Sequence, residues 1–184
     1  MPSLIDIRRR IRTVRNTQQI TKAMKMVAAA RLRRAQDRVI AARPYAGMFS
    51  KLLSNVAAAA AKDERLASHP LLAERPEKRI QLILVTADRG LAGAFNSNLI
   101  KAAQRFLVEH SDAKVELELL GRKGRDFFRR RDVTVSGDAV GLAAKVNYSD
   151  AARIARKVME RFRADEIDSV YVLYNEFKDR KSVV

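Results

Sequence analysis

The 184-residue sequence predicts an α/β fold in which a long N-terminal coiled-coil helix is joined to a small, mostly parallel, Rossmann-like α/β domain. Residues 3–61 contain one glycine and one proline among residues that favour helices, which predicts the helix. Residues 79–184 alternate apolar runs of strand length with stretches of helical periodicity, which predicts the α/β domain. Hydrophobic residues make up 47% of the chain, enough to bury a core and to exclude a wholly disordered chain.

An apolar heptad runs along the helix expected over residues 1–61. Ser3 is expected to cap its start, with Asp6 near the positive end of the helix dipole. The heptad frame holds on both sides of Pro44, which favours one long helix kinked at the proline over two separate helices. Such a helix is typical of a coiled-coil arm. The larger residues of its predicted seam include Leu4, Ile7, Ile11, Val14, Leu32 and Val39.

The apolar frame fails at three consecutive positions, where polar residues occur. These positions are Gln18, Thr21 and Lys25. In the same window, apolar residues occur instead at Ile20, Met24 and Val27, about a third of a turn from the seam. Either the helix presents a second, local face to another partner, or these residues widen a single buried stripe.

The positive charge is concentrated in the N-terminal segment. The formal net charge is +16, and residues 1–51 hold 13 Lys and Arg against two Asp, which predicts an acidic partner. Arginines along one helix can neutralise the phosphates of a nucleic acid. Against that reading, the arginines overlap the apolar seam and no aromatic residue lies among them before Tyr45 and Phe49. An acidic protein surface fits the charge equally well.

A connector is expected at residues 62–78, followed by the α/β domain at 79–184. Within that domain, strands are expected at 79–87, 114–121, 132–137 and 168–177, and helices at 94–110, 121–131 and 147–167. Ser149 or Asp150 is expected to cap the last helix.

Two motifs in this domain could bind phosphate. TADRGLAGAFN lies between a strand and a helix, but it lacks a P-loop ending and has only Gly90 and Gly93, so a nucleotide-dependent enzyme is a distant alternative. Its Asp88 and Arg89 form either an exposed contact pair or a local salt bridge. GRKGRDFFRRR is either a phosphate-binding knot or, as we favour, an amphipathic helix that packs its phenylalanines on the sheet.

The composition excludes several other classes of protein. There is no cysteine, and the two histidines are far apart, so neither a metal site nor a bound cofactor is expected. No catalytic set of Ser, His and Asp is visible. No apolar run is long enough to cross a membrane, and the N-terminus has no secretory signal, so direct membrane insertion is not expected.

Residues 7–36, IRRRIRTVRNTQQITKAMKMVAAARLRRAQ, resemble the N-terminal helix of the γ subunits of F-type ATP synthases. TADRGLAGAFN, GRKGRDFFRRR and YNEF resemble other signatures of that family, in the same order. The resemblance implies a non-catalytic rotor shaft that couples rotation of the proton-driven c-ring to conformational change at the catalytic β subunits. The implied partners are the α and β subunits of the hexamer, the ε subunit and the c-ring, with no nucleic acid.

The resemblance also implies where the partners bind. The stretch around Lys22, Met24, Lys25 and Val27 would contact an acidic loop of β. The remaining expected interface residues are Arg8, Arg9, Arg10 and Arg12, where the shaft meets the inner sleeve of the hexamer, together with Asp88 and Arg89. The long seam would face a second γ helix.

That second long C-terminal helix of the family is absent from this sequence. The chain is therefore expected to be a fragment or the product of a truncated gene. Alone, it is expected to self-associate through the unpaired seam or to leave the arm frayed. The absence of a transit peptide favours a bacterial complex, peripheral on the cytoplasmic side of the plasma membrane.

Overall fold

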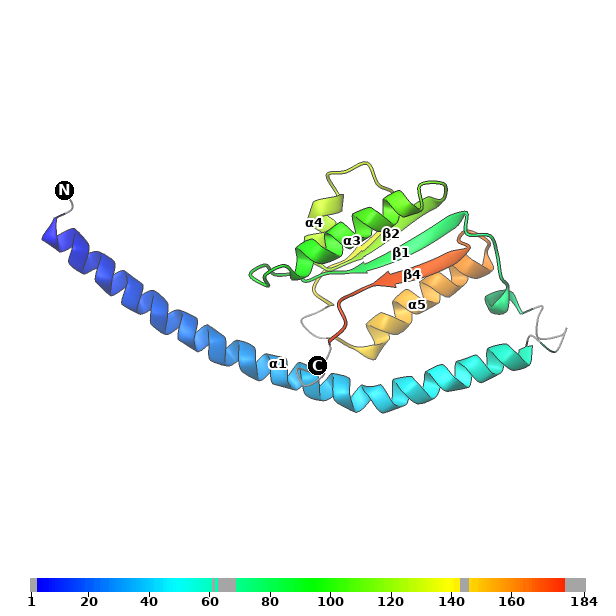
Figure 1. Ribbon diagram of the computed structural model, residues 1–184, viewed down its shortest axis with the longest axis horizontal. Helices are drawn as coiled ribbons and strands as arrows, with labels where there is room; N and C mark the ends of the chain where they lie inside the picture. The colour runs from blue at the N-terminus through cyan, green and yellow to red at the C-terminus, as the bar shows by residue number, and fades with distance from the viewer. Residues whose placement is uncertain (1–2, 61, 63–68, 143–145, 178–184) are drawn as a thin grey trace. The chain divides into compact units, whose positions relative to one another are not determined.

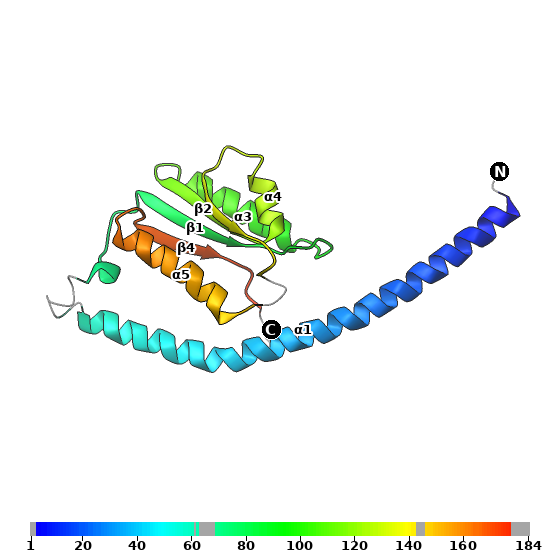
Figure 2. The same cartoon turned by 180° about the vertical axis from the view of Figure 1, so that it is seen from behind.

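The computed structural model describes residues 3–60, 62, 69–142 and 146–177, which belong to two compact units, 1–64 and 65–184. The first unit is the helix α1 (Leu4–Ala60). Its 57 residues correspond to about 86 Å at 1.5 Å per residue. The predicted single long helix is confirmed, and it is bowed along its length (Figures 1 and 2).

The cap predicted at Ser3 is confirmed, and Asp6 adds a hydrogen bond that was not predicted. The Ser3 hydroxyl accepts a hydrogen bond from the Ile5 N–H at 3.3 Å, and the Asp6 carboxylate accepts one from the Ser3 N–H at 3.2 Å. The helix then continues through Pro44. Because proline has no N–H, the carbonyl of Ile40 loses its helical partner at this point.

The second unit is an α/β domain whose strands and helices alternate in the predicted order. After a 3-10 turn, η1 (Pro70–Leu72), the strands are β1 (Arg79–Val85), β2 (Lys114–Leu120), β3 (Val135–Ala139) and β4 (Ser169–Leu173). The helices are α3 (Phe95–Glu109), α4 (Arg122–Phe128) and α5 (Tyr148–Arg163). The sheet order is β3-β2-β1-β4 and each strand pairing is parallel, which matches half of a doubly wound Rossmann sheet.

Some predicted boundaries are wrong. The third strand starts at Val135 rather than at residue 132, and the fourth ends at Leu173 rather than at 177. The N-cap of α5 is Asn147, because this residue has the extended backbone typical of an N-cap (φ −117°, ψ 147°). Ser149 and Asp150 lie inside the first turn of that helix.

The main core lies between the sheet and α3 and α4. The register pairs Leu82 with Leu117 and Leu84 with Leu119, so one face of β1 and β2 is leucine throughout. Leu99, Ala103 and Phe128 from the two helices pack on this face, and all seven residues of the cluster are buried. Alternation along a strand sends the intervening residues to the opposite face, where α5 lies.

That opposite face is polar at its centre. Glu118 pairs with Lys157 at 2.9 Å, and Glu116 pairs with Arg161 at 2.8 Å. Burial opposes the charge of Glu116, but hydrogen bonds from Arg161 and Lys114 outweigh it and hold its pKa below the usual value. Ion pairs therefore help to hold α5 on the sheet, whereas α3 and α4 pack on the sheet through Leu99, Ala103 and Phe128.

Candidate subunit interface

The predicted seam of α1 is an exposed apolar stripe. Its six larger residues keep between 40% of their surface exposed, at Val39, and 66%, at Leu4. The same holds for the predicted local face, where Ile20, Met24 and Val27 are each more than half exposed. An isolated surface with this much apolar area is typical of a protein–protein contact.

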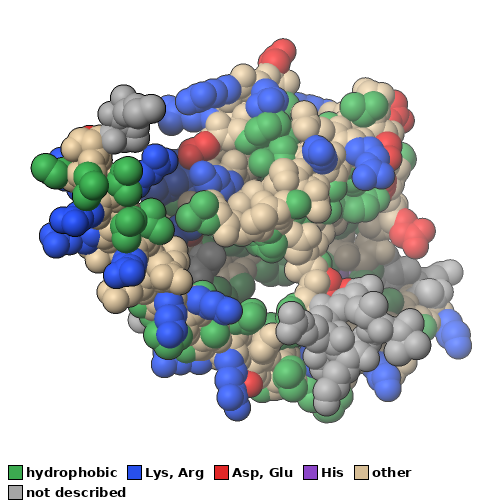
Figure 3. All heavy atoms as spheres, turned by 60° about the vertical axis from the view of Figure 1, so that its left-hand side comes forward, with side chains coloured by type: hydrophobic (Ala, Val, Ile, Leu, Met, Phe, Trp, Pro, Cys, Tyr) green, Lys and Arg blue, Asp and Glu red, His purple; other side chains and the backbone are tan. Residues whose placement is uncertain are grey.

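The basic residues expected at the interface are exposed as well, but they do not form one face. Arg8, Arg9 and Arg10 follow one another at about 100° per residue, so their side chains spread over an arc of about 200° around the helix. Lys22 and Lys25 are also exposed. The space-filling view shows blue Lys and Arg side chains interspersed with green hydrophobic ones (Figure 3).

A ladder of threonine hydroxyls extends the local face toward the N-terminus. Thr13 donates a hydrogen bond to the carbonyl of Arg9 at 3.0 Å, and Thr17 donates one to the carbonyl of Thr13 at 2.9 Å. Since these hydroxyls are satisfied within the helix, the face offers methyl groups to a partner. Sequence reasoning missed this ladder, although its four-residue spacing was visible.

The TADRGLAGAFN segment uses its polar side chains to tie loops together. The Thr86 hydroxyl donates to the carbonyl of Leu120 at 3.2 Å and accepts from the Gly124 N–H at 2.9 Å. Asn96 accepts a hydrogen bond from the Ala87 N–H at 2.9 Å. The motif therefore holds the start of α4 and the start of α3 against the end of β1.

Asp88 completes this arrangement. Its carboxylate accepts hydrogen bonds from the backbone N–H groups of Arg122, at 3.0 Å, and Gly141, at 3.1 Å. A carboxylate thus occupies the start of α4, which disfavours phosphate binding at the GRKGRDFFRRR segment. Asp88 is half-buried, whereas Arg89 next to it is exposed and remains available for a partner.

The tip of the same loop carries a residue that sequence reasoning missed. Leu91 is fully exposed, with its backbone in the left-handed region at φ +60°. This region is costly for a leucine, and such backbone strain clusters at functional sites. The only sequence signal was an apolar residue between two glycines.

The GRKGRDFFRRR segment forms the amphipathic helix α4 that we favoured. Phe128 is buried in the core cluster, and Phe127 packs against that cluster. The Arg131 guanidinium lies 3.4 Å from the centre of the Phe127 ring and donates to the Phe127 carbonyl at 2.9 Å. Arg131 is therefore engaged within the domain.

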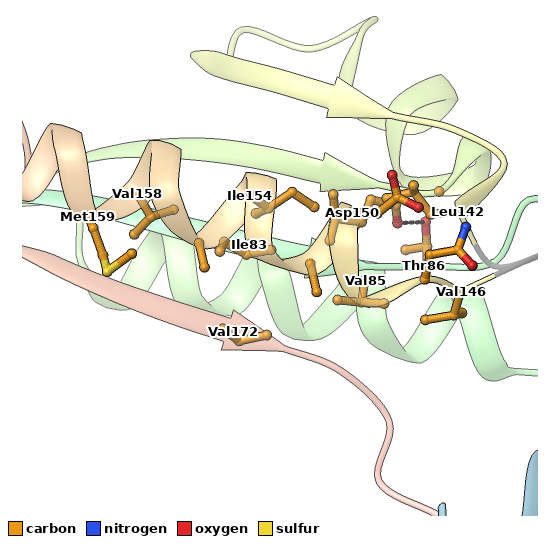
Figure 4. A pocket seen from close by; sticks show the side chains of 15 residues that line it. Ile83, Val85, Thr86, Leu142, Val146, Asp150, Ile154, Val158, Met159 and Val172 are labelled. Atoms are coloured by element: carbon orange, nitrogen blue, oxygen red, sulfur yellow. Dashed lines mark hydrogen bonds between the residues drawn. The ribbon is translucent and has the colours of Figure 1, made fainter. Parts of the chain in front are cut away.

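A groove lies between α5 and the sheet. It has a volume of about 560 Å³ and is lined mainly by apolar side chains, among them Ile83, Val172, Ile154 and Val158 (Figure 4). None of the 16 residues of α5 is buried, so its apolar face is only partly seated on the sheet.

A family model described as ATP synthase matches residues 3–183. The chain belongs to the ATP synthase family. Among curated relatives in this family, it is 68% identical over 178 residues to the ATP synthase gamma chain of Solibacter usitatus and 51% identical over 180 residues to that of Anaeromyxobacter dehalogenans. Each alignment covers 97% of this chain and 62% of the relative, so the chain spans less than two thirds of their length.

A solved structure of the ATP synthase family has the same fold. The chain aligns with a TM-score of 0.69 and 30% identity to a chain in the cryo-EM structure of the Tetrahymena thermophila mitochondrial ATP synthase central stalk and c-ring. This alignment covers 87% of the present chain and 66% of the other. In the part of the chain that the structure describes, no helix has the length and apolarity required to span a bilayer.

Proposed function

We propose that the protein is the γ subunit of a proton-translocating F-type ATP synthase, acting as a non-catalytic part of the central stalk. The observation that carries this proposal is 68% identity to an ATP synthase gamma chain over 97% of the present chain. In this role the protein couples rotation of a c-ring to conformational change at the catalytic β subunits.

The shape and surface of α1 support this proposal. A helix of about 86 Å reaches far beyond what a small globular domain needs. It has an exposed apolar seam for a second helix and a separate exposed face at Ile20, Met24 and Val27 for a surrounding partner. The basic side chains of Arg8, Arg9, Arg10 and Arg12 cover a little more than half of the helix circumference and attract an acidic sleeve.

Other partners follow from the same proposal. The α/β domain binds the ε subunit and the c-ring, with Arg89 and Leu91 at an exposed loop tip as the contact residues we favour. The protein is then peripheral to the bacterial plasma membrane, on its cytoplasmic side. No catalytic residue is assigned to it, since catalysis in this proposal belongs to the β subunits.

The proposal is tested by size-exclusion chromatography of the chain with an α and β hexamer at physiological salt, with competitor duplex DNA present. We expect co-elution with the hexamer. Lys25→Glu and Met24→Lys should each weaken it, because one reverses a charge and the other puts a charge in an apolar contact. Arg33→Glu and Met26→Lys are matched controls, since these exposed residues lie off both proposed contact faces.

Co-elution with the DNA in place of the hexamer would contradict the proposal and favour a basic nucleic-acid-binding helix. Equal losses for the test and control variants would contradict the assigned contact on α1 but not the proposal as a whole.

A further inference from the structure

The groove between α5 and the sheet has the features of a small-molecule binding site. Its floor is formed by β1 and the residue after it, where Ile83 and Thr86 are 8% and 4% exposed, and one wall is formed by α5 (Figure 4). Its other side is open, because Val172 on β4 and Met159 on α5 keep 56% and 38% of their surface exposed. The volume of about 560 Å³ falls within the range of pockets that hold small ligands.

The groove lies where open parallel sheets place their ligands. In the order β3-β2-β1-β4, β1 has one neighbour on each side, and the helices α3 and α5 pack on opposite faces of the sheet. The strand order therefore reverses direction at β1. Thr86 directly follows the carboxyl end of β1, and Asn147 begins α5 at the same edge of the sheet. Ligands of such sheets bind in the crevice at this point.

Most of the groove is aliphatic. Apolar side chains of α5 line it at helical spacing from Ala151 to Met159, a distance of about 12 Å at 1.5 Å per residue. Among the residues that the structure describes, no aromatic, lysine or arginine side chain lines it. An aliphatic chain therefore fits the groove better than a planar ring, which would find no other ring to stack on.

The polar side chains that line the groove lie together at one end. Asn147 and Asp150, at the start of α5, are close to Thr86 (Figure 4). The Asn147 side chain makes no capping hydrogen bond, and the carboxylate of Asp150 pairs with Arg153 at the long distance of 3.8 Å. An ammonium group at this end can therefore pair with Asp150, whereas a carboxylate or phosphate would be repelled by its charge.

An extended peptide fits the groove poorly. The Thr86 hydroxyl is already hydrogen-bonded to Leu120 and Gly124. The Gly121 N–H donates to the Ala139 carbonyl at 2.8 Å. The backbone of a peptide would thus find few partners along an aliphatic wall, and unpaired backbone groups are costly.

We propose that this groove binds a single aliphatic chain that ends in a protonated amine. The chain lies against Ile154, Val158 and Val172, and the ammonium group pairs with Asp150. The inference goes beyond the proposed central-stalk function and does not rest on it, because the groove lies wholly within the α/β domain.

The test is a titration of the full chain with decylamine, followed by NMR of ¹³C-labelled methionine methyl groups. Met159 lines the groove and reports on it. The exposed methionines of α1, which are Met24, Met26 and Met48, report on binding elsewhere. We expect the Met159 signal, assigned by its loss in Met159→Leu, to shift and saturate while the α1 signals stay in place. The shorter octylamine should bind about ten-fold more weakly, because each buried methylene group adds affinity.

Two pairs of variants then locate the ligand. Asp150→Asn should weaken binding of decylamine by about three-fold or more, but should leave binding of the uncharged decanol unchanged. Its control is Asp132→Asn, since Asp132 is exposed and does not line the groove. Ala155→Trp should abolish the Met159 shift by filling the groove, whereas Ala164→Trp, at the exposed C-cap of α5, should not.

Circular dichroism of each variant confirms that the helices remain, and if Ala155→Trp unfolds α5, the comparison of Asp150→Asn with its control decides. A Met159 shift no larger than those of the α1 methionines would overturn the proposal. Binding of decanoate at Met159 as tight as that of decylamine, or equal losses in the test and control variants, would also overturn it. Because no hexamer is present in this assay, its failure is distinguishable from failure of the proposed central-stalk function.

Discussion

Individual side chains at the ends of the parallel strands join separate loops of the α/β domain. Thr86 hydrogen-bonds to the Leu120 carbonyl at the end of β2 and to the Gly124 N–H in α4. Asp88 accepts hydrogen bonds from the N–H groups of Arg122 and Gly141. Such contacts require the backbones to approach closely, which explains why glycine occurs at position 121. A Cβ there would lie 2.1 Å from the Thr86 carbonyl oxygen.

Gly121→Ala should therefore destabilise the domain by about 3 kcal/mol or more, since it adds a steric clash to a backbone held at φ +103°. Gly141→Ala is the matched control, because its φ is +88° but a Cβ added there would meet no atom within 4 Å. It should cost about 1–2 kcal/mol from backbone strain alone. Urea unfolding measures the free energy of unfolding of both variants. Equal losses of stability would show that the steric clash at position 121 contributes nothing.

Asp168 gives a prediction for the dependence of stability on pH. Its carboxylate accepts hydrogen bonds from the Arg79 side chain, which, with the charge and backbone N–H of Arg79, hold the pKa of Asp168 below its usual value despite burial. A lowered folded-state pKa stabilises the fold above the unfolded pKa of about 3.9, and this stabilisation is lost as the pH falls.

Asp168→Asn should accordingly unfold at lower urea concentration than the unmodified chain at pH 7. The difference should begin to narrow as the pH falls below about 4, because the unfolded carboxylate is protonated near pH 3.9 whereas the folded one keeps its charge to a lower pH. Urea titrations of both proteins at a series of pH values measure this. If the difference in stability between the two proteins stays constant with pH, the charge of Asp168 is not the cause of the destabilisation.

The apolar periodicity of the sequence predicted most of the helices and strands but not the polar contacts between them. The order of strands and helices was readable because each has its own apolar spacing. The inward-facing positions of Glu116 and Glu118 could not be predicted, because alternating charge in KVELELL is equally typical of a strand face exposed to solvent. Their partners on α5 are about 40 residues away, and no local pattern connects them. The hydrogen bonds of Asp88 were missed for the same reason.

The helix α1 contains a proline at position 44 that lowers its stability. Pro44→Ala should restore a backbone donor and raise the stability of the helix by up to about 3 kcal/mol. Gly47→Ala, where a Cβ would meet nothing within 4 Å, should raise it by only about 1 kcal/mol. Thermal melting of the helical circular dichroism signal measures both changes. A Pro44→Ala variant that melts no higher than the Gly47→Ala variant would show that Pro44 does not destabilise the helix.

The exposed seam of α1 predicts that the chain self-associates when no partner is present. The chain should sediment as a mixture of species that shifts with protein concentration, or its helix should melt without cooperativity. Ile11→Lys together with Val14→Lys should reduce association, because both side chains lie in the seam. A single sharp monomeric boundary combined with cooperative melting of the helix would contradict the prediction.

In the proposed function, α1 acts as a shaft inside a hexamer of α and β subunits. Because the chain has no cysteine, Met24→Cys introduces a unique site for cross-linking. The most direct test is native mass spectrometry of the cross-linked complex. We predict one chain per hexamer, joined to a β subunit through position 24. Several chains per hexamer, or cross-linking no stronger than from Met159→Cys in the α/β domain, would contradict the claim.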